Sequence, residues 1–229
     1  MTNPWGSVAD WVVAIGTLTL AILAAFQDRI RRLFFRPMLS ASITTGQPDC
    51  HFVPLARSGG IQIGITLYLR LWITNAPDAA PAQMVEVYAR QLERERVDKR
   101  WERVPTFPPM NLTWSHQGGS HYPLIAPGMG KHCDLARVSD PAIRSTVGDE
   151  NPSLNLTPQQ TSLAFELIAK PNHLGHIVGP GHYRLTILVA AGNGSPIEQC
   201  VDIDLRGAWY ANEAQMLRDG IGVSIGPRE

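Results

Sequence analysis

Three histidines lie close together in the stretch NHLGHIVGPGH. His173, His176 and His182 could supply three imidazole ligands to a zinc ion and leave a fourth coordination position open for catalysis. Convergence of three rings needs a helix or a rigid hairpin, whereas this stretch is rich in proline and glycine. We therefore expect exposed loop histidines, keep the three residues only as weak metal candidates, and predict no cofactor.

Other catalytic patterns are missing or incomplete. The chain has no G-x-S-x-G elbow, no H-E-x-x-H helix and no Rossmann-type glycine pattern. The stretch APGMGKHC around Lys131 lacks the first glycine and the final Ser or Thr of a phosphate-binding loop. A triad assembled in space from distant residues stays open. The sequence leans against an enzyme, and a membrane-tethered hydrolase or metal enzyme is the least favoured alternative.

The overall charge excludes one large class of partner. Twenty basic residues balance twenty acidic ones, so the chain has no global positive field to attract nucleic acid. The three cysteines, Cys50, Cys133 and Cys200, are odd in number and lack a C-x-x-C pair. They fit a reducing compartment better than a disulfide framework or a zinc site.

The strongest signal is an apolar run near the N-terminus. Residues 11–26, WVVAIGTLTLAILAAF, contain no charge, and a helix of this length spans about 24 Å. The hydrocarbon core of a bilayer is about 30 Å thick, so flanking residues must help the helix to cross it. Suitable residues are Trp11 at one interface and Arg29, Arg31, Arg32 and Arg36 at the other. The sequence therefore predicts a membrane anchor over residues 1–36.

The charges around this run predict its orientation. Residues 1–10 contain no Lys or Arg, whereas four arginines follow the run. Because Lys and Arg are retained on the cytoplasmic side, we expect the N-terminus outside and the C-terminal domain in the cytoplasm, at the inner membrane. Thr17, Ala21 and Ala25 form a small-xxx-small face, on which two such helices could approach and form a homo-oligomer.

Residues 37–208 are expected to form an all-β domain. In residues 61–75, IQIGITLYLRLWITN, aliphatic side chains occupy every odd position as far as Ile73, a period of two that indicates a strand with one buried face. Several further apolar runs are separated by Gly and Pro turns rather than by helices. This pattern is typical of a two-sheet antiparallel sandwich. Residues 209–229 are expected to add a short helical segment.

Two aromatic residues fall on the other face of this strand. Tyr68 and Trp72 occupy even positions and mark a possible partner surface. The alternative is that the C-terminal segment, which bears Trp209 and Tyr210, covers them.

Two passages resemble known sandwich domains. The stretch LRLWITNAPDAAPAQMVEV resembles the strand, turn and strand of bacterial immunoglobulin-like domains, and GPGHYRLTILV is similar to the start of a late strand in such folds. Together with the N-terminal helix, the chain resembles uncharacterised bacterial single-pass membrane proteins with an immunoglobulin-like β-sandwich. The resemblance implies an architecture and no activity.

These features predict a membrane-anchored cytoplasmic β-sandwich that acts as a protein-interaction or scaffold module. Its expected partners are the lipid bilayer and an unknown cytoplasmic protein. An alternative is an effector gated by a ligand or partner, whose helices self-associate through the small-residue face.

Overall fold

A computed structural model describes residues 7–34, 36–56 and 59–226 of the chain. The chain divides into two compact units, residues 1–36 and residues 37–229. The first unit contains one helix and the second contains two β-sheets.

Helix α1 spans Val8–Phe34. It begins with a reciprocal cap, because the Ser7 amide donates to the Asp10 carboxylate at 2.7 Å and the Asp10 amide donates to Ser7 Oγ at 3.3 Å. The window from Val8 to Phe26 is long and apolar enough to cross a membrane, and none of it is buried. The prediction of one long apolar helix is confirmed.

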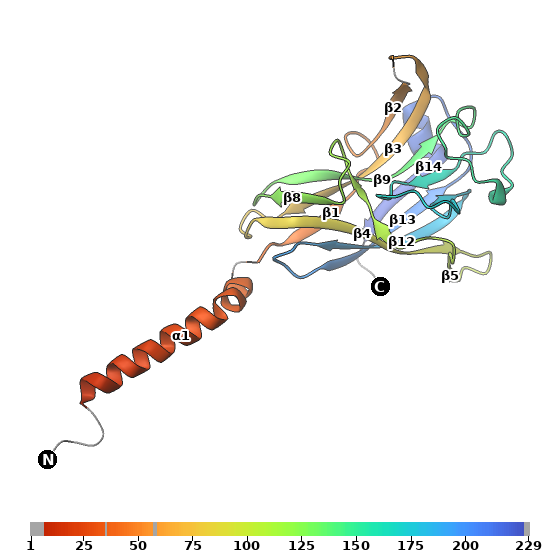
Figure 1. Cartoon of the computed structure of the whole chain (residues 1–229). Helices are drawn as coiled ribbons and strands as arrows, with labels where there is room; N and C mark the ends of the chain where they lie inside the picture. The colour runs from red at the N-terminus through yellow and green to blue at the C-terminus, as the bar shows by residue number, and fades with distance from the viewer. Residues whose placement is uncertain (1–6, 35, 57–58, 227–229) are drawn as a thin grey trace. The chain divides into compact units, whose positions relative to one another are not determined.

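The second unit consists of two antiparallel sheets arranged as a sandwich (Figure 1). Sheet A contains β1 Leu39–Ser42, β2 Cys50–Ala56, β3 Gln62–Asn75, β7 Thr113–Trp114, β9 Gly130–Ser139, β10 Leu163–Phe165 and β11 Ile177–Val178. Sheet B contains β4 Ala82–Glu95, β5 Trp101–Arg103, β6 Met110–Asn111, β8 His121–Ile125, β12 Gly181–Ala190, β13 Ile197–Leu205 and β14 Ile221–Gly226. The antiparallel sandwich predicted from the sequence is confirmed.

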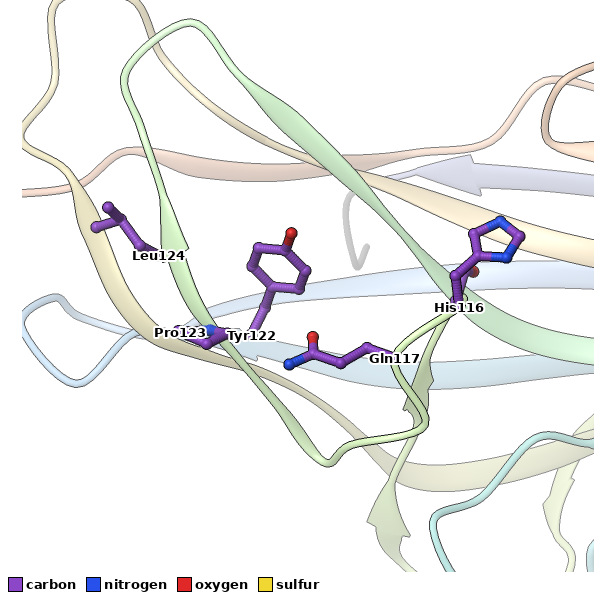
Figure 2. Close-up of a pocket in the computed structure, with 6 residues that line it drawn as sticks. His116, Gln117, Tyr122, Pro123 and Leu124 are labelled. Carbon is purple, nitrogen blue, oxygen red and sulfur yellow. The ribbon is translucent and has the colours of Figure 1, made fainter.

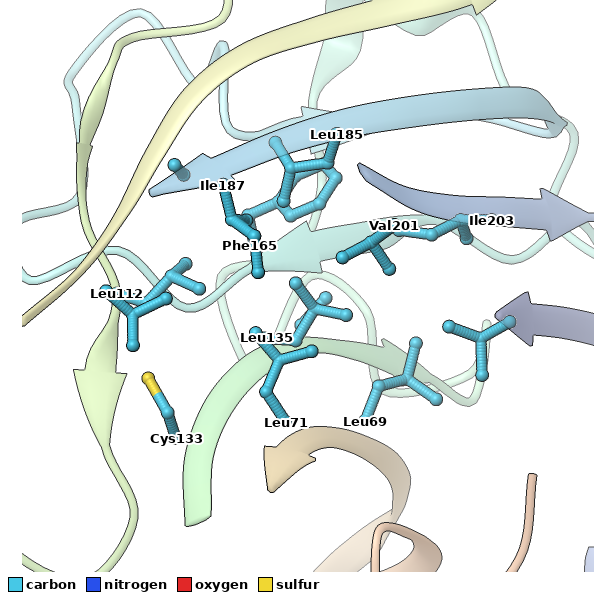
Figure 3. Close-up of a cluster of buried hydrophobic side chains, with 14 of the residues drawn as sticks. Leu69, Leu71, Leu112, Cys133, Leu135, Phe165, Leu185, Ile187, Val201 and Ile203 are labelled. Atoms are coloured by element: carbon cyan, nitrogen blue, oxygen red, sulfur yellow. The ribbon is translucent and has the colours of Figure 1, made fainter. Parts of the chain in front are cut away.

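The core lies between the two sheets and follows the period-two pattern of the strands. On β3, the odd positions Leu67, Leu69 and Leu71 are completely buried, as the alternation of the sequence predicts. Side chains from sheet B, including Leu185 and Ile187 on β12, meet them from the other side (Figure 3). Burial of this continuous apolar cluster is the main stabilising term of the domain.

Several short strands were not visible in the sequence. Strands β2 and β8 contain Pro54 and Pro123, which interrupt the donor pattern expected of a strand. Each of these strands pairs with one neighbour only, β2 with β3 and β8 with β4. A proline is tolerated there because one side of the strand needs no ladder hydrogen bonds.

The C-terminal segment is part of the sandwich. Residues 209–229 were expected to form a short helical piece, and helical turns are found at α2 Glu213–Gln215 and at the π-helical turn η2 Met216–Gly220. The chain then continues as β14, which pairs with β13 from Cys200↔Gly226 to Leu205↔Ile221. The alternation of Ile221, Val223 and Ile225 explains the strand, because Ile221 and Val223 are buried against the core.

Candidate functional site

Polar side chains gather on the outer face of sheet A, opposite the core. Tyr68, Arg70 and Trp72 project there because they alternate with the buried leucines of β3. The register with β9 places Arg70 opposite Asp134 and Trp72 opposite His132. We call the set His51, Arg70, Trp72, Ser115, His132 and Asp134 the outer polar face.

Asp134 is the centre of this face. Its Oδ1 accepts a hydrogen bond from Ser115 Oγ at 2.6 Å and another from Arg70 Nε at 3.0 Å. The Nη1 atom of Arg70 also lies 3.2 Å from Nε2 of His51. With side-chain exposures of 13% for Arg70 and 17% for Asp134, the pair is largely shielded from water and its geometry is fixed by packing on both sides.

A second pair joins the outer polar face to the loop before β2. His132 Nε2 lies 2.9 Å from Oδ1 of the buried Asp49, and the other oxygen of Asp49 accepts the Thr44 amide at 2.8 Å. The His132 ring packs against Trp72 with 4.5 Å between ring centroids. The imidazole is therefore held on both sides, by a carboxylate and by an indole.

The fold thus brings serine, histidine and aspartate together from distant parts of the chain, and their connections decide what they can do. Ser115 donates its hydroxyl to Asp134, and Arg70 binds the same carboxylate oxygen. Among the described residues the Ser115 hydroxyl bonds to a carboxylate and not to a histidine, so the arrangement is not that of a Ser-His-Asp triad.

An open hollow of about 490 Å³ adjoins Ser115. His116 and Gln117 come from the turn between β7 and β8, and Tyr122 and Leu124 come from β8, as Figure 2 shows. The Tyr122 ring packs between Trp114, at 5.3 Å, and the ammonium of Lys131, at 5.4 Å. The hollow therefore places one partly buried aromatic ring, that of Tyr122, beside polar side chains.

Further along β9, the outer face carries a buried ion cluster. Arg137 binds Asp149 through two hydrogen bonds of 2.8 and 2.5 Å and binds Glu166 at 2.7 Å, while Ser139 donates to Asp149 at 2.6 Å. Burial raises the pKa of Glu166, although the charge of Arg137 opposes this effect. Burial also raises the pKa of Tyr68, as does the nearby charge of Glu166. The cluster ties the loop that holds Asp149 to sheet A.

The two aromatic residues predicted as a partner surface lie on this face but are only half-exposed. Trp72 lies across Gly130, where a Cβ atom would come within 2.5 Å of the indole. The alternative, that Trp209 covers Trp72, differs from the observed contact, since Trp209 stacks on Phe52 at 5.2 Å. Tyr68 lies under the guanidinium of Arg70, 5.2 Å from the ring centroid.

The three histidines considered as metal ligands have different environments. His173 is exposed and accepts the Gly175 amide, whereas His182 lies 3.2 Å from Glu95. His176 is buried, and neither of its ring nitrogens has a hydrogen-bond partner. Within residues 7–34, 36–56 and 59–226, no three His, Cys, Asp or Glu side chains are arranged to hold a metal ion.

The candidate residues of the helix are exposed wherever the structure describes their side chains. Trp11 is 55% exposed, and Thr17, Ala21 and Ala25 are exposed along α1. The side chains of Arg29, Arg31 and Arg32 lie outside the described residues, and Arg36 is exposed. Self-association and contact with headgroups stay predictions.

All three cysteines are buried and free. Burial raises the pKa of Cys50 to about 11 and raises that of Cys133 well above its ordinary value. The thiols of Cys50 and Cys133 are therefore poor nucleophiles.

No family model, curated protein or solved structure matches this chain. Sequence reasoning did not assemble the outer polar face, because its members come from four separate segments. One signal was available for part of it: Arg70 and Asp134 stand at polar positions between apolar ones in their strands.

Proposed function

We propose that this chain is a membrane-anchored interaction module, with α1 in the bilayer and the β-sandwich in the cytoplasm. The observation that carries the proposal is the apolar window from Val8 to Phe26, none of which is buried. Helices of soluble proteins bury their apolar side chains, whereas a lipid bilayer accepts apolar side chains on all sides.

The β-sandwich supports the second half of the proposal. It has a continuous core of its own, built from residues of both sheets. The open hollow beside Ser115 places the Tyr122 ring among the polar side chains of His116 and Gln117, a composition that favours recognition of a cytoplasmic protein. A two-sheet sandwich fits such a role, since sandwich domains bind partners through their faces and edges.

Membrane extraction of the full chain tests the anchor. The double variant Leu18→Lys, Ile22→Lys should leave the membrane fraction, because each central lysine costs about 2.5 to 3.5 kcal/mol of insertion free energy. The matched variant Leu18→Ala, Ile22→Ala should remain in carbonate-washed membranes and retain an N-terminal epitope tag. Recovery of the tagged wild-type chain in the soluble fraction would refute the anchor.

Two C-terminal fusions test the orientation, one to a reporter active only in the cytoplasm and one to a reporter active only outside. Activity of the first is expected. Activity of the second reporter would show that the C-terminal domain lies outside the cytoplasm, opposite to the proposed orientation.

Site-specific crosslinking tests the interaction surface. A photoreactive residue at Gln117, in the hollow, should capture a discrete cytoplasmic protein, whereas the same residue at the fully exposed Val97 should not. The same crosslinked species from both positions would show that the hollow has no selectivity.

A further inference from the structure

The sandwich has two ends that differ in composition. We call the end at which the chain passes from residue 37 into β1 the proximal end. The turns 76–81, 126–129 and 191–196 lie there, beside the start of β1 (Figure 1). The strand registers also place these turns together, because the residues that border them are paired: Leu39 with Asn75, Thr74 with Gly130, and Ala82 with Ile125.

Exposed apolar side chains gather at the proximal end. They are Met38, at 59% exposure, Met84 and Leu124, both at 49%, and Met129, at 52%. We call these four residues the proximal rim. Large exposed apolar side chains in one region indicate an interaction site, since isolated ones are scattered over a surface.

The charges at this end are sparse. In the three proximal turns, with sequences APDAAP, APGM and AGNGSP, Asp78 is the single ionisable residue. At the opposite end, the turn after β4 reads RVDKR and carries four charges in five residues. Val97, in that turn, is also exposed but is surrounded by charge. The proximal end therefore has the lower cost of leaving water.

The proximal end is held in a fixed shape by one buried side chain. Asn75 Oδ1 accepts the Met38 amide at 3.0 Å, and Asn75 Nδ2 donates to the carbonyls of Ala80, at 2.8 Å, and Ile125, at 3.2 Å. The backbone amide of Asn75 also donates to the Met129 carbonyl, and the backbone carbonyl of Asn75 accepts from the Gly128 amide. Met38 and Met129 are thus held by backbone hydrogen bonds to Asn75, while Met84 and Leu124 lie in strands β4 and β8, so the rim needs little reorganisation to bind.

Chain connectivity indicates what the rim contacts. Helix α1 ends at Phe34, and Met38 follows four residues later. Four extended residues span at most about 14 Å. The covalent chain therefore keeps Met38, at the proximal end, within about 14 Å of the end of the helix.

We propose that the proximal rim inserts into the lipid surface, so that the sandwich rests on the bilayer by its Met38, Met84, Leu124 and Met129 side chains. The proposal depends on the proposed membrane anchor. Methionine and leucine at a surface bind the boundary between headgroups and acyl chains through apolar burial, at depths of about 5 to 10 Å.

Fluorescence quenching of the full chain in liposomes tests this inference. The buried native cysteines Cys50, Cys133 and Cys200 leave single surface cysteines free for selective labelling with an environment-sensitive dye. Labels are placed at Met129→Cys and Leu124→Cys in the rim, at Val97→Cys at the opposite end, and at Leu20→Cys in the helix. The vesicles are phosphatidylethanolamine and phosphatidylglycerol with a nitroxide on the acyl chains.

The expected result is a loss of most of the fluorescence at Leu20, a clear loss at Leu124 and Met129, and none at Val97. Quenching at Leu20 with no more quenching in the rim than at Val97 would overturn the inference and leave the anchor intact. In that case, a blue-shifted rim label would show a protein cover in place of lipid. An unquenched label at Leu20 would refute the anchor itself.

Discussion

His176 is the residue whose environment is least suited to its chemistry. It is completely buried, and both ring nitrogens lack a hydrogen-bond partner. Burial lowers its pKa to about 4, and the charge of Lys170 acts in the same direction. The folded domain therefore keeps this ring neutral at pH values at which an unfolded chain protonates it.

This difference predicts a loss of stability in acid. Because the folded pKa lies below the unfolded value near 6.5, the stabilising contribution is complete above pH 6.5 and is lost as the pH falls toward 4. The loss should approach about 3 kcal/mol. Denaturant unfolding of His176→Leu in detergent should show a shallower decline between pH 6.5 and 4. Exposed His116→Gln is the control, and an equal change in that variant would contradict the assignment to His176.

Arg137 is the second residue with a specific prediction. It neutralises the completely buried Asp149 and the largely buried Glu166. Arg137→Met should destabilise the domain by about 3 to 5 kcal/mol, since it leaves Asp149 as an unpaired buried charge. Arg90→Met, which removes an exposed pair with Glu198, should cost less than about 1 kcal/mol. Equal losses in thermal unfolding would show that the Arg137 cluster adds nothing beyond a surface ion pair.

At the scale of elements, Asn75 joins the end of β3 to two turns and to the start of β1. Asn75→Ala should cost about 2 to 4 kcal/mol, because it removes three hydrogen bonds and leaves the buried Ile125 carbonyl and the partly buried Met38 amide and Ala80 carbonyl without partners. Asn193→Ala removes two hydrogen bonds in an exposed turn and should cost under about 1 kcal/mol. Amide hydrogen exchange should be faster at residues 76–81 and 126–129 in Asn75→Ala and unchanged there in Asn193→Ala.

The elements also show how far the sequence could predict the fold. Strand β3 was predictable because its aliphatic residues alternate with other side chains from Ile63 to Ile73, and the buried face follows this alternation from Leu67 onward. Strands β2 and β8 were not, because their edge positions tolerate Pro54 and Pro123. The outer polar face was harder to predict than either strand. Ser115 and Asp134 meet through strand register, and Asp49 reaches His132 from a loop 83 residues away in sequence, a pairing that no local pattern encodes.

The whole molecule combines an apolar helix with a domain that folds around its own core. Association of two copies through the helix is the property that belongs to this scale. The hydroxyls of Thr17 and Thr19 both donate to the carbonyl four residues earlier, at 2.8 Å. The two threonines are thus chemically matched. They lie on opposite sides of the helix, since two residues turn it by about 200°.

This match gives a test of the small-residue face. If Thr17, Ala21 and Ala25 form the contact between two helices, Thr17→Ile should weaken dimers roughly tenfold, because the extra bulk prevents close approach of the backbones. Thr19→Ile adds the same bulk to the opposite side and should leave association unchanged. Energy transfer between labelled full-length chains in liposomes, measured at several protein-to-lipid ratios, gives both values. Equal transfer in the two variants would place any dimer contact elsewhere, and the outer polar face of the sandwich would be the next surface to vary.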